Sequence, residues 1–349
     1  MDALSPSVID AVAMLRATAE TQVKGALAHQ RLSEIDGQVR KALEDVESTL
    51  VAVVQAGAVP ATDAAAHLLA AGGKRIRPLA VLLSARCCGQ VTEPIREIAS
   101  ASELVHLATL LHDDVIDDAD QRRGQIASRR VWGNAVSVLA GDLLLTHALE
   151  RTQNCASQVT LRELLQALRK LVDGEVLQLR GRSRFDGTQV TYFQIIEHKT
   201  AALFVWAMRA GAREAGGSDE AIDALGNFGA DLGMAFQLVD DVLDYAGEAN
   251  MTGKSLFADL ADGKATLPLI YALESNASLL AQVELAVAGD GEAAQMLARE
   301  VVATGAADRV RTLARQFGAR AEQRLSGLPD TQARRMLAGI AAQLSARSC

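Results

Sequence analysis

Apolar residues recur at spacings of three and four along nearly the whole chain, and this periodicity most constrains its fold. One such stripe contains Leu161, Leu164, Leu165, Leu168 and Leu171, which is typical of an amphipathic helix. The alternation of period two that marks a half-buried strand is nearly absent. Aromatic residues make up only 3% of the 349 residues, and the 6 prolines are few, which favours long helices over sheets. We therefore predict an all-α protein.

No Pro- or Ser-rich linker divides the chain into separate domains. The breaks fall at glycines such as Gly72 and Gly216, and Thr188 stands at N-cap distance before a helical stripe. Length alone would suggest about two domains. We instead predict a single-domain helical bundle over residues 31–349, preceded by a helical extension over residues 1–30.

Charge and cysteine content narrow the possible functions. With 35 basic against 43 acidic residues, the formal net charge of −8 argues against a nucleic-acid partner. The four cysteines form no CxxC pair, which favours a reducing, cytoplasmic compartment. The acidic N-terminal segment is unlike a signal peptide, and the longest uncharged stretch, residues 48–62, is too short for a membrane span.

One acidic pentad occurs twice, each time after an apolar stretch. It reads DDVID from Asp113 to Asp117 and DDVLD from Asp240 to Asp244. Positions i and i+4 of a helix share a face, so each pentad aims two carboxylates the same way. Most acidic runs are simply solvated. Here the flanks are apolar, and like charges about 4 Å apart repel by about 4 kcal/mol at an effective dielectric of about 20. Such clusters therefore require cations.

The ligand atoms indicate which cation. Oxygen-only ligands suit a hard divalent ion, Mg²⁺ rather than zinc. Magnesium usually binds one or two carboxylates together with substrate phosphates. Two such clusters facing each other predict Mg²⁺-dependent binding of a diphosphate. The chain contains no GxxxxGK[ST] loop, so a P-loop nucleotide site is not supported.

Basic residues near the pentads and glycine breaks supply candidate anion ligands. Lys74 and Arg77 are three apart at the start of a predicted helix, where the helix N-terminus and an arginine fork both attract anions. His106 lies seven residues before Asp113 on the same helix face. Taken singly, these residues fit a helix cap or a packed histidine equally well. The other basic candidates are Arg122, Arg123, Lys199, Lys254 and Lys264.

Six motifs, taken in order, resemble those of the polyprenyl synthetase family, the trans-isoprenyl diphosphate synthases. GGKRIRP at residues 72–78 resembles the first basic motif of that family. ELVHLATLLHDDVIDDADQRRG at residues 103–124 resembles its first aspartate-rich motif. The other four are GEVLQL at 174–179, HKTA at 198–201, FQLVDDVLDY at 236–245 and DGKATLP at 262–268.

The resemblance implies a fold and an activity. It implies the isoprenoid synthase type I fold, a helical bundle around a deep central cavity, and a homodimer. The implied reaction is head-to-tail condensation of isopentenyl diphosphate onto an allylic diphosphate, farnesyl or geranylgeranyl diphosphate. Apolar cavity walls would keep the allylic cation from water. No general base is obvious, so the released diphosphate is expected to take the proton.

The resemblance also implies roles for individual residues. Four aspartates would hold about three Mg²⁺ ions, with Mn²⁺ as an alternative: Asp113, Asp117, Asp240 and Asp244. Five further residues would complete the catalytic set: Asp114, Asp241, Lys199, Thr200 and Gln237, the last two lining the reacting centre. Isopentenyl diphosphate would be bound by Lys74, Arg77, His106 and Arg123. The allylic diphosphate would be bound by Arg122, Lys199, Lys254 and Lys264.

One loop departs from the family pattern. After the second pentad, Phe257 stands where the family usually has glycine, close to Lys254. The role expected for Lys254 depends on the conformation of this loop.

In the family, the helix with the first pentad sets the cavity floor, and short-chain members have aromatic residues four and five positions before its first aspartate. Here these positions are Thr109 and Ala108, with Val105 one turn further, and all three are small. Small side chains leave room for a growing chain, so we predict a long all-trans product of about C30 to C50, octaprenyl-like. The alternative is that they only allow close helix packing and that a bulky residue elsewhere stops the chain, as in a short- or medium-chain synthase.

Three other functions fit parts of the pattern. A class I terpene cyclase carries an aspartate pentad, but its second metal motif is normally a mixture of Asn, Ser and Glu, unlike DDVLD. A non-catalytic subunit of a heteromeric synthase should have lost aspartates or arginines, and none is lost here. A diphosphate hydrolase would not need two anion sites, and the chain shows no distinct base for one.

Overall fold

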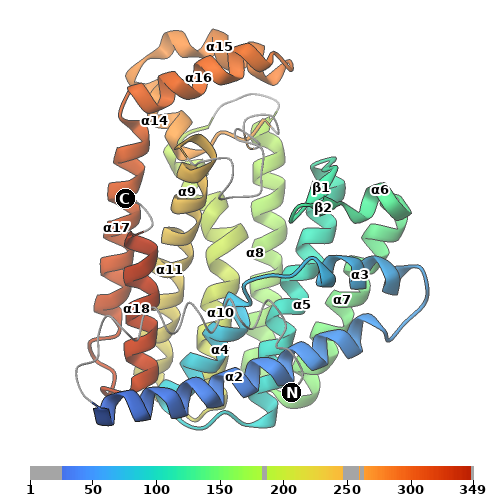
Figure 1. Cartoon of the computed structure of the whole chain (residues 1–349), viewed down its shortest axis with the longest axis vertical. Helices are drawn as coiled ribbons and strands as arrows, with labels where there is room; N and C mark the ends of the chain where they lie inside the picture. Colours follow the sequence, from blue (N-terminus) through green and yellow to red (C-terminus); the bar gives the residue numbers. More distant parts are fainter. Residues whose placement is uncertain (1–25, 183–186, 247–258, 260–262, 347–349) are drawn as a thin grey trace. The chain divides into compact units, whose positions relative to one another are not determined.

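The computed structural model describes residues 26–182, 187–246, 259 and 263–346, and most of them are helical (Figure 1). The described strands are two short ones, β1 (Gln121–Arg122) and β2 (Gln125–Ile126). The all-α prediction is therefore confirmed. The chain forms two compact units. The first takes its described residues from Met1–Leu165, Leu203–Gly229 and Arg324–Ile340, and the second from Gln166–Ala202, Ala230–Gln323 and Ala341–Cys349.

The first unit is built from the N-terminal helices together with β1 and β2. Its complete helices are α2 (Ala26–Val54), α3 (Ala61–Ala70), α4 (Ile76–Cys88), α5 (Glu93–Ile116), α6 (Ser128–Trp132) and α7 (Asn134–Cys155). α2 runs unbroken past residue 30, where the sequence predicted the end of an extension. Residues 1–25 of that predicted extension lie outside the described residues. The single-domain organisation stays a prediction.

α5 is the central helix of the first unit. It packs chiefly against α7 and α4, and also against α2. Ile98, Leu104, Leu107 and Leu111 on it are fully buried. A helix that is apolar on most sides must be surrounded by other elements. Pro94 fits the first turn of α5, where a proline removes no intrahelical hydrogen bond. The helix that carries the first pentad is thus rigidly held.

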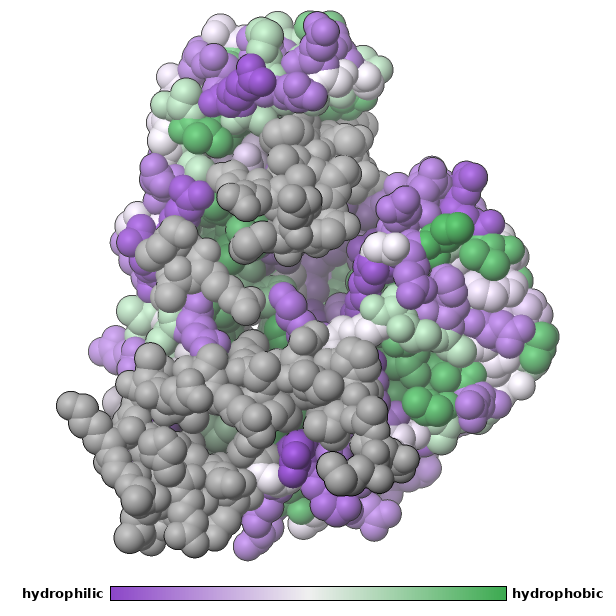
Figure 2. All heavy atoms as spheres, viewed as in Figure 1, coloured by the Kyte–Doolittle hydropathy of each residue, from purple (hydrophilic) through white to green (hydrophobic). Residues whose placement is uncertain are grey.

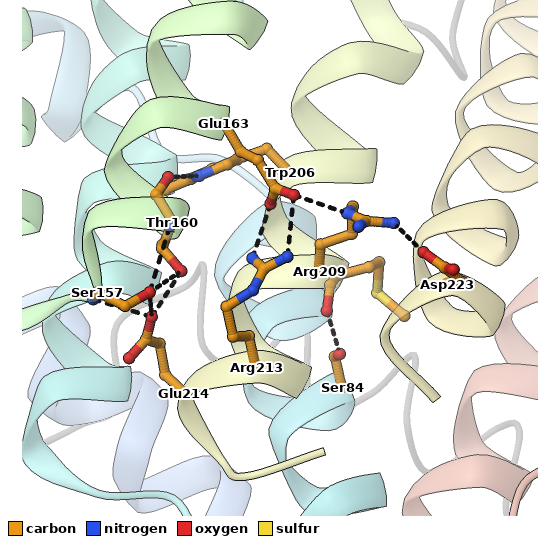
Figure 3. A network of polar contacts seen from close by, with 10 residues as sticks. Ser84, Ser157, Thr160, Glu163, Trp206, Arg209, Arg213, Glu214 and Asp223 are labelled. Carbon is orange, nitrogen blue, oxygen red and sulfur yellow. Dashed lines mark hydrogen bonds and ion pairs between the residues drawn. The ribbon is translucent and has the colours of Figure 1, made fainter. Parts of the chain in front are cut away.

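A partly buried polar network fastens two further helices within the first unit (Figure 3). It joins the first turns of α8 (Gln158–Arg182) to the last turns of α10 (Ala202–Glu214). Arg213 donates to both carboxylate oxygens of Glu163, at 2.7 and 2.9 Å, and Arg209 donates to the same group at 3.1 Å. Glu214 accepts hydrogen bonds from Ser157 and Thr160. Two-pronged arginine–carboxylate contacts fix direction as well as distance, so this network sets the register of α8 against α10.

The second unit contains the rest of the chain. Its helices include α9 (Gln189–Ile196), the π-helical turn η1 (Glu197–Ala201), most of α11 (Asp219–Ala246), α14 (Leu267–Ser275) and the 3₁₀ turn η2 (Ala277–Leu279). The C-terminal ones are α15 (Leu280–Val287), α16 (Gly291–Ala303), α17 (Ala306–Arg324) and part of α18 (Gln332–Ala346). Leu238, Leu267, Leu297 and Val301 are fully buried in its core.

Two local features of the described helices bear on earlier expectations. The hydroxyl of Thr188 accepts a hydrogen bond from the backbone nitrogen of Thr191 at 3.1 Å, which confirms the predicted cap of α9. None of the described helices combines the length with the apolar run that crossing a membrane would need.

Candidate active site

The first pentad lies at the C-terminal end of α5. The helix ends at Ile116, so Asp113 is helical and Asp117 is the C-cap residue, whose backbone nitrogen donates to the carbonyl of Asp113 at 2.8 Å. Asp114 is only 1% exposed, whereas Asp113 and Asp117 are partly exposed. The pentad therefore has one buried carboxylate between two that ligands can reach.

Arg122 neutralises the buried carboxylate of the first pentad. Its Nε and Nη2 both approach Oδ1 of Asp114 at 2.6 Å. Burial raises the pKa of Asp114, and the Arg122 guanidinium opposes that rise. Oδ2 of Asp114 is buried and accepts no hydrogen bond from the described residues. Arg122, predicted to bind the allylic diphosphate, is thus also an internal partner of the pentad.

Arg122 and Arg123 are placed by a hairpin that sequence reasoning missed. β1 pairs with β2 in antiparallel register, with Arg122 opposite Gln125. Both central residues of the turn have positive φ, 52° at Arg123 and 74° at Gly124. This is the two-residue turn whose twist suits a hairpin, and glycine adopts its second position without strain. In the sequence, the Arg123-Gly124 dipeptide was the pattern that could have indicated this turn.

The loop before α4 is held by a residue that the sequence analysis did not select. Arg75 is 2% exposed and has a left-handed backbone, with φ of 48°. It donates twice to Glu47, both at 2.8 Å, and once to Glu103 at 3.0 Å. α4 begins at Ile76, so Arg77 lies in its first turn and Lys74 precedes it, exposed. Arg75 ties this loop to α2 and α5.

Arg77, His106 and Arg123 are brought together within the first unit. Burial, together with the charge of Arg123, lowers the pKa of Arg77 to about 10. Burial and the positive charges of four arginines, Arg77 first, hold the pKa of His106 well below its ordinary value, so its ring is neutral. The Nε of Arg77 is buried and finds no acceptor among the described residues. The cluster places several guanidinium donors together, an arrangement suited to an anion.

Two glutamates partly balance this arginine cluster. Glu103 opposes the pKa depression of both Arg77 and Arg123. Glu103 and Glu47 are already ion-paired with Arg75. The remaining positive charge of Arg77 and Arg123 is therefore available for a ligand.

The second pentad lies on α11 and has different surroundings. Asp240 is exposed, while Asp241 and Asp244 are 2% and 9% exposed. Burial raises the pKa of Asp241 to about 8, and the charge of Asp259 adds to the rise. The partners of Asp241 are neutral donors. The Tyr192 hydroxyl lies 2.5 Å from Oδ2, and Gln237 Nε2 lies 2.8 Å from Oδ1.

The predicted residues Lys199 and Thr200 lie in the π-helical turn η1, not at the start of a regular α-helix. Such turns are rare and often mark functional sites. Lys199 forms an ion pair with Glu175 and lies 3.3 Å from Oε1 of Gln178. Thr200 donates to Oε1 of Gln237 at 2.9 Å. The structure therefore brings Thr200, Gln237 and Asp241 into one hydrogen-bonded chain.

Two glycines allow this turn to sit against neighbouring helices. A Cβ at Gly174 of α8 would meet Cβ of His198 at 2.8 Å and Cγ of Lys199 at 2.9 Å. A Cβ at Gly233 of α11 would meet Cα of Ala201 at 2.6 Å. Larger residues would push the turn away from α8 and α11. Close packing against η1 thus explains why the GEVLQL motif begins with a glycine.

The loop after the second pentad is only partly described. Lys254 and the altered segment 255–258 lie outside the described residues. Lys264 has its Nζ 3.9 Å from Oδ1 of Asp259, and its backbone nitrogen donates to the Asp259 carbonyl at 2.8 Å. The backbone nitrogen of Asp259 lies 3.3 Å from Oδ2 of Asp244. Lys264 is thus linked to the second pentad through Asp259.

The pentads offer the ligand atoms that magnesium takes. Among the described residues, no group of three or more His, Cys, Asp or Glu side chains is arranged to hold a metal ion alone. Magnesium does not need one, since it usually takes one or two carboxylates and completes its shell with water and substrate phosphates. The oxygen-only donors and the unsatisfied Oδ2 of Asp114 fit a hard divalent cation.

Of the three small residues on α5, two are buried and Thr109 is partly exposed. Val105 and Ala108 are 0% and 2% exposed, and Thr109 donates its hydroxyl to the His106 carbonyl at 2.8 Å. The Thr109 hydroxyl is therefore satisfied within α5. Ala108 and Thr109 lie between His106 and Asp113, and Val105 lies one position before His106. All of them are on α5.

Comparison with known proteins adds independent support. Residues 60–304 match the polyprenyl synthetase family. Heptaprenyl diphosphate synthase component 2 of Geobacillus stearothermophilus is 37% identical over 310 residues, 87% of this chain and 95% of that protein. Octaprenyl diphosphate synthase of Escherichia coli (strain K12) is 37% identical over 278 residues, 79% of this chain and 86% of that protein.

A solved structure covers the whole chain. The crystal structure of polyprenyl synthase from Caulobacter crescentus CB15, complexed with calcium and isoprenyl diphosphate, has a TM-score of 0.83 and 33% identity, with 100% of each chain covered. These likenesses confirm the expected family, the isoprenoid synthase fold and the prenyltransferase class. The chain belongs to the polyprenyl synthetase family.

Proposed function

We propose that this protein is a Mg²⁺-dependent trans-polyprenyl diphosphate synthase that joins isopentenyl diphosphate to an allylic diphosphate. One observation carries the proposal: α5 contributes side chains to two chemically different clusters, one basic and one acidic. His106 belongs to a metal-independent arginine cluster, and Asp113 begins a carboxylate pentad. Seven residues of helix separate them by about 10 Å, two turns on one side of α5. An elongating enzyme needs two diphosphate sites, whereas a hydrolase or cyclase needs one.

We assign the arginine cluster to isopentenyl diphosphate. Arg77 and Arg123 supply positive charge, and the neutral ring of His106 supplies a hydrogen bond without adding repulsion. Lys74 is exposed just before α4 and adds a further positive charge. This substrate brings a double bond as its nucleophile, so no activated side chain is required.

We assign the carboxylate pentads to the allylic diphosphate. Asp113, Asp117, Asp240 and Asp244 would hold about three divalent ions, with Mg²⁺ favoured and Mn²⁺ as an alternative. Bound metal would neutralise charge that develops on the leaving diphosphate. Further positive charge comes from Arg122, Lys199, Lys264 and Lys254.

The chain's own residues then govern the cation. When the C–O bond breaks, Thr200 and Gln237 present oxygen dipoles to the allylic carbon. Isopentenyl diphosphate attacks through its double bond, and the proton lost from the new cation passes to the released diphosphate. This reaction needs no nucleophilic side chain, and the described residues contain no nucleophile–histidine–acid arrangement.

We propose a long product, about C30 to C50, made from farnesyl or geranylgeranyl diphosphate. Val105, Ala108 and Thr109 carry no bulky side chain that would stop a growing chain early. The heptaprenyl and octaprenyl names of the two relatives agree with this length. A short- or medium-chain synthase is the alternative, and product sizing separates the two.

The test is a direct assay. Purified protein is incubated with Mg²⁺, farnesyl diphosphate and labelled isopentenyl diphosphate, and the products are sized by chromatography. We expect labelled chains longer than C30. If no label enters a prenyl product from farnesyl, geranyl or geranylgeranyl diphosphate, the proposal fails.

Subunit composition is a separate proposal. Figure 2 shows apolar side chains gathered on the surface of the first unit where α3, α6 and α7 lie. Exposed residues of β2, α6 and α7 include Ile126, Val131 and Leu139, each more than half exposed. Exposed apolar clusters usually mark interaction surfaces. We propose a cytoplasmic homodimer, and Leu139→Asp should release monomers in light scattering.

A heteromeric synthase is the alternative assembly. The Geobacillus relative is by its name one component of a heptaprenyl diphosphate synthase. If this chain needs a partner, it will be inactive alone and gain activity when a second protein from its own cell is added. A chain that elongates alone as a homodimer excludes that requirement.

A further inference from the structure

Four side chains of the second unit form one continuous line of hydrogen bonds. The Tyr192 hydroxyl lies 2.5 Å from Oδ2 of Asp241, and Gln237 Nε2 lies 2.8 Å from Oδ1 of the same carboxylate. Thr200 Oγ1 lies 2.9 Å from Oε1 of Gln237. The line runs from the buried Tyr192 on α9 to Thr200 in the π-helical turn η1.

The line has a fixed direction. Gln237 turns its amide nitrogen toward Asp241, whose Oδ1 accepts the hydrogen bond. Its carbonyl oxygen then faces Thr200, and Thr200 must donate its single hydroxyl proton to it. The hydroxyl oxygen of Thr200 keeps its lone pairs for another partner.

Tyr192 anchors the far end of this line. It is 4% exposed, in the core of the second unit, and its ring packs edge-on against Phe193 at 5.4 Å. Burial and the neighbouring Asp241 charge raise the pKa of the phenol well above its ordinary value, so the hydroxyl keeps the proton that it donates. Phenylalanine would fill the same volume, which means that packing alone does not require the hydroxyl.

We propose that Tyr192 is a positioning residue, which holds Asp241 so that Gln237 and Thr200 present oxygen lone pairs to the developing allylic cation. The inference rests on the function proposed above. Dipoles fixed before reaction stabilise a developing charge without having to reorient. Without the Tyr192 hydroxyl, the Asp241 carboxylate can rotate, and the Gln237 amide loses the partner that sets its orientation.

The first test is Tyr192→Phe. We expect turnover to fall about tenfold, while KM for both diphosphates stays within about twofold, because the hydroxyl acts on the cation and not on substrate binding. The control is Tyr271→Phe, which removes a hydroxyl from another buried tyrosine of the same unit, 5% exposed, whose ring faces Arg309. Tyr271→Phe should keep wild-type turnover. Wild-type turnover in Tyr192→Phe overturns the proposal.

A double-mutant cycle separates positioning from general packing. Thr200→Val removes the hydroxyl at which the line ends. If Tyr192 acts through Thr200, adding Tyr192→Phe to Thr200→Val causes little further loss, less than about twofold. Multiplied losses would show that Tyr192 acts by another route and would overturn the proposal.

A separate assay distinguishes failure of the proposed elongation function from failure of the role proposed for Tyr192. Ionisation of farnesyl diphosphate is followed as diphosphate release without isopentenyl diphosphate. This step needs the allylic cation but not chain elongation. If the wild-type protein ionises farnesyl diphosphate but incorporates no isopentenyl diphosphate, the elongation function is overturned. The ionisation rates of the wild-type protein and Tyr192→Phe then still test the role of Tyr192. A wild-type protein that ionises no allylic diphosphate overturns both.

Discussion

The two pentads have nearly the same sequence but opposite internal partners. In the first, the buried Asp114 meets the positively charged Arg122 at 2.6 Å. In the second, the hydrogen-bond partners of the buried Asp241 among the described residues are the neutral donors Tyr192 and Gln237. A charged partner opposes the charge of a buried carboxylate, whereas neutral donors orient the group without supplying an opposite charge, and the pKa of Asp241 is accordingly raised to about 8. We infer that the first pentad is partly neutralised by the protein and that the second depends more on bound cations.

The largest expected effect comes from removing an accessible carboxylate of either pentad. Asp113→Ala and Asp240→Ala should each lower kcat by about a hundredfold to a thousandfold, because each removes a metal-binding oxygen needed to stabilise the leaving group. Steady-state turnover with farnesyl diphosphate is the measurement, and circular dichroism checks the fold. Wild-type rates in either variant would remove the metal-binding assignment of that pentad.

The second prediction compares the internal partners by stability. Arg122→Gln leaves Asp114 buried beside a neutral group and should lower the free energy of unfolding by about 3 kcal/mol. Tyr192→Phe removes one neutral donor and should cost about 1 kcal/mol. Urea unfolding of the metal-free protein measures both.

A matched arginine serves as the control for that stability comparison. Arg129 pairs with Asp118 and Asp120, whose side chains are 80% and 69% exposed. Arg129→Gln should therefore cost less than about 1 kcal/mol. Equal losses from Arg122→Gln and Arg129→Gln would contradict the inference that Arg122 neutralises a buried charge.

The third prediction concerns pH. The pKa of Asp241 is raised to about 8, so the folded protein binds a proton that the unfolded chain releases near its ordinary, lower pKa. The unfolding free energy of the metal-free protein should therefore fall as pH rises from about 5 to about 8. Asp241→Asn should flatten this decline. A slope that is identical in Asp241→Asn would show that Asp241 is not its source.

The smallest effect on rate should come from a substitution on α5, five positions before the first pentad. Ala108→Phe should shorten the longest product while turnover changes by less than about threefold, because a larger side chain narrows the room for the chain without touching either diphosphate. Chromatography of labelled products gives the answer. An unchanged product distribution would mean that another residue limits chain length.

Much of the candidate site followed from the sequence because its signals are local. The repeated pentads, the basic residues at the start of α4 and the Thr188 cap are patterns of neighbouring residues, and the structure places them on helices or at helix ends. The assignments of individual residues to substrates stay predictions.

The supporting residues could not be found in this way because their roles arise from packing. Arg75 reaches Glu47 and Glu103, each 28 residues away, and Tyr192 reaches Asp241 across 49 residues. No periodicity links such positions. The π-helical turn at Lys199 depends likewise on the close approach that Gly174 and Gly233 allow. These contacts belong to the tertiary structure, and a local pattern does not contain them.

The central claim is that both pentads serve the allylic diphosphate through divalent cations. Calorimetric binding of a non-ionisable farnesyl diphosphate analogue, with and without Mg²⁺, tests it most directly. We predict tight binding only with Mg²⁺, and at least a tenfold loss of affinity in Asp113→Ala and in Asp240→Ala alike. Undiminished binding in either variant, or tight binding to the wild-type protein in the presence of a chelator, would contradict the account.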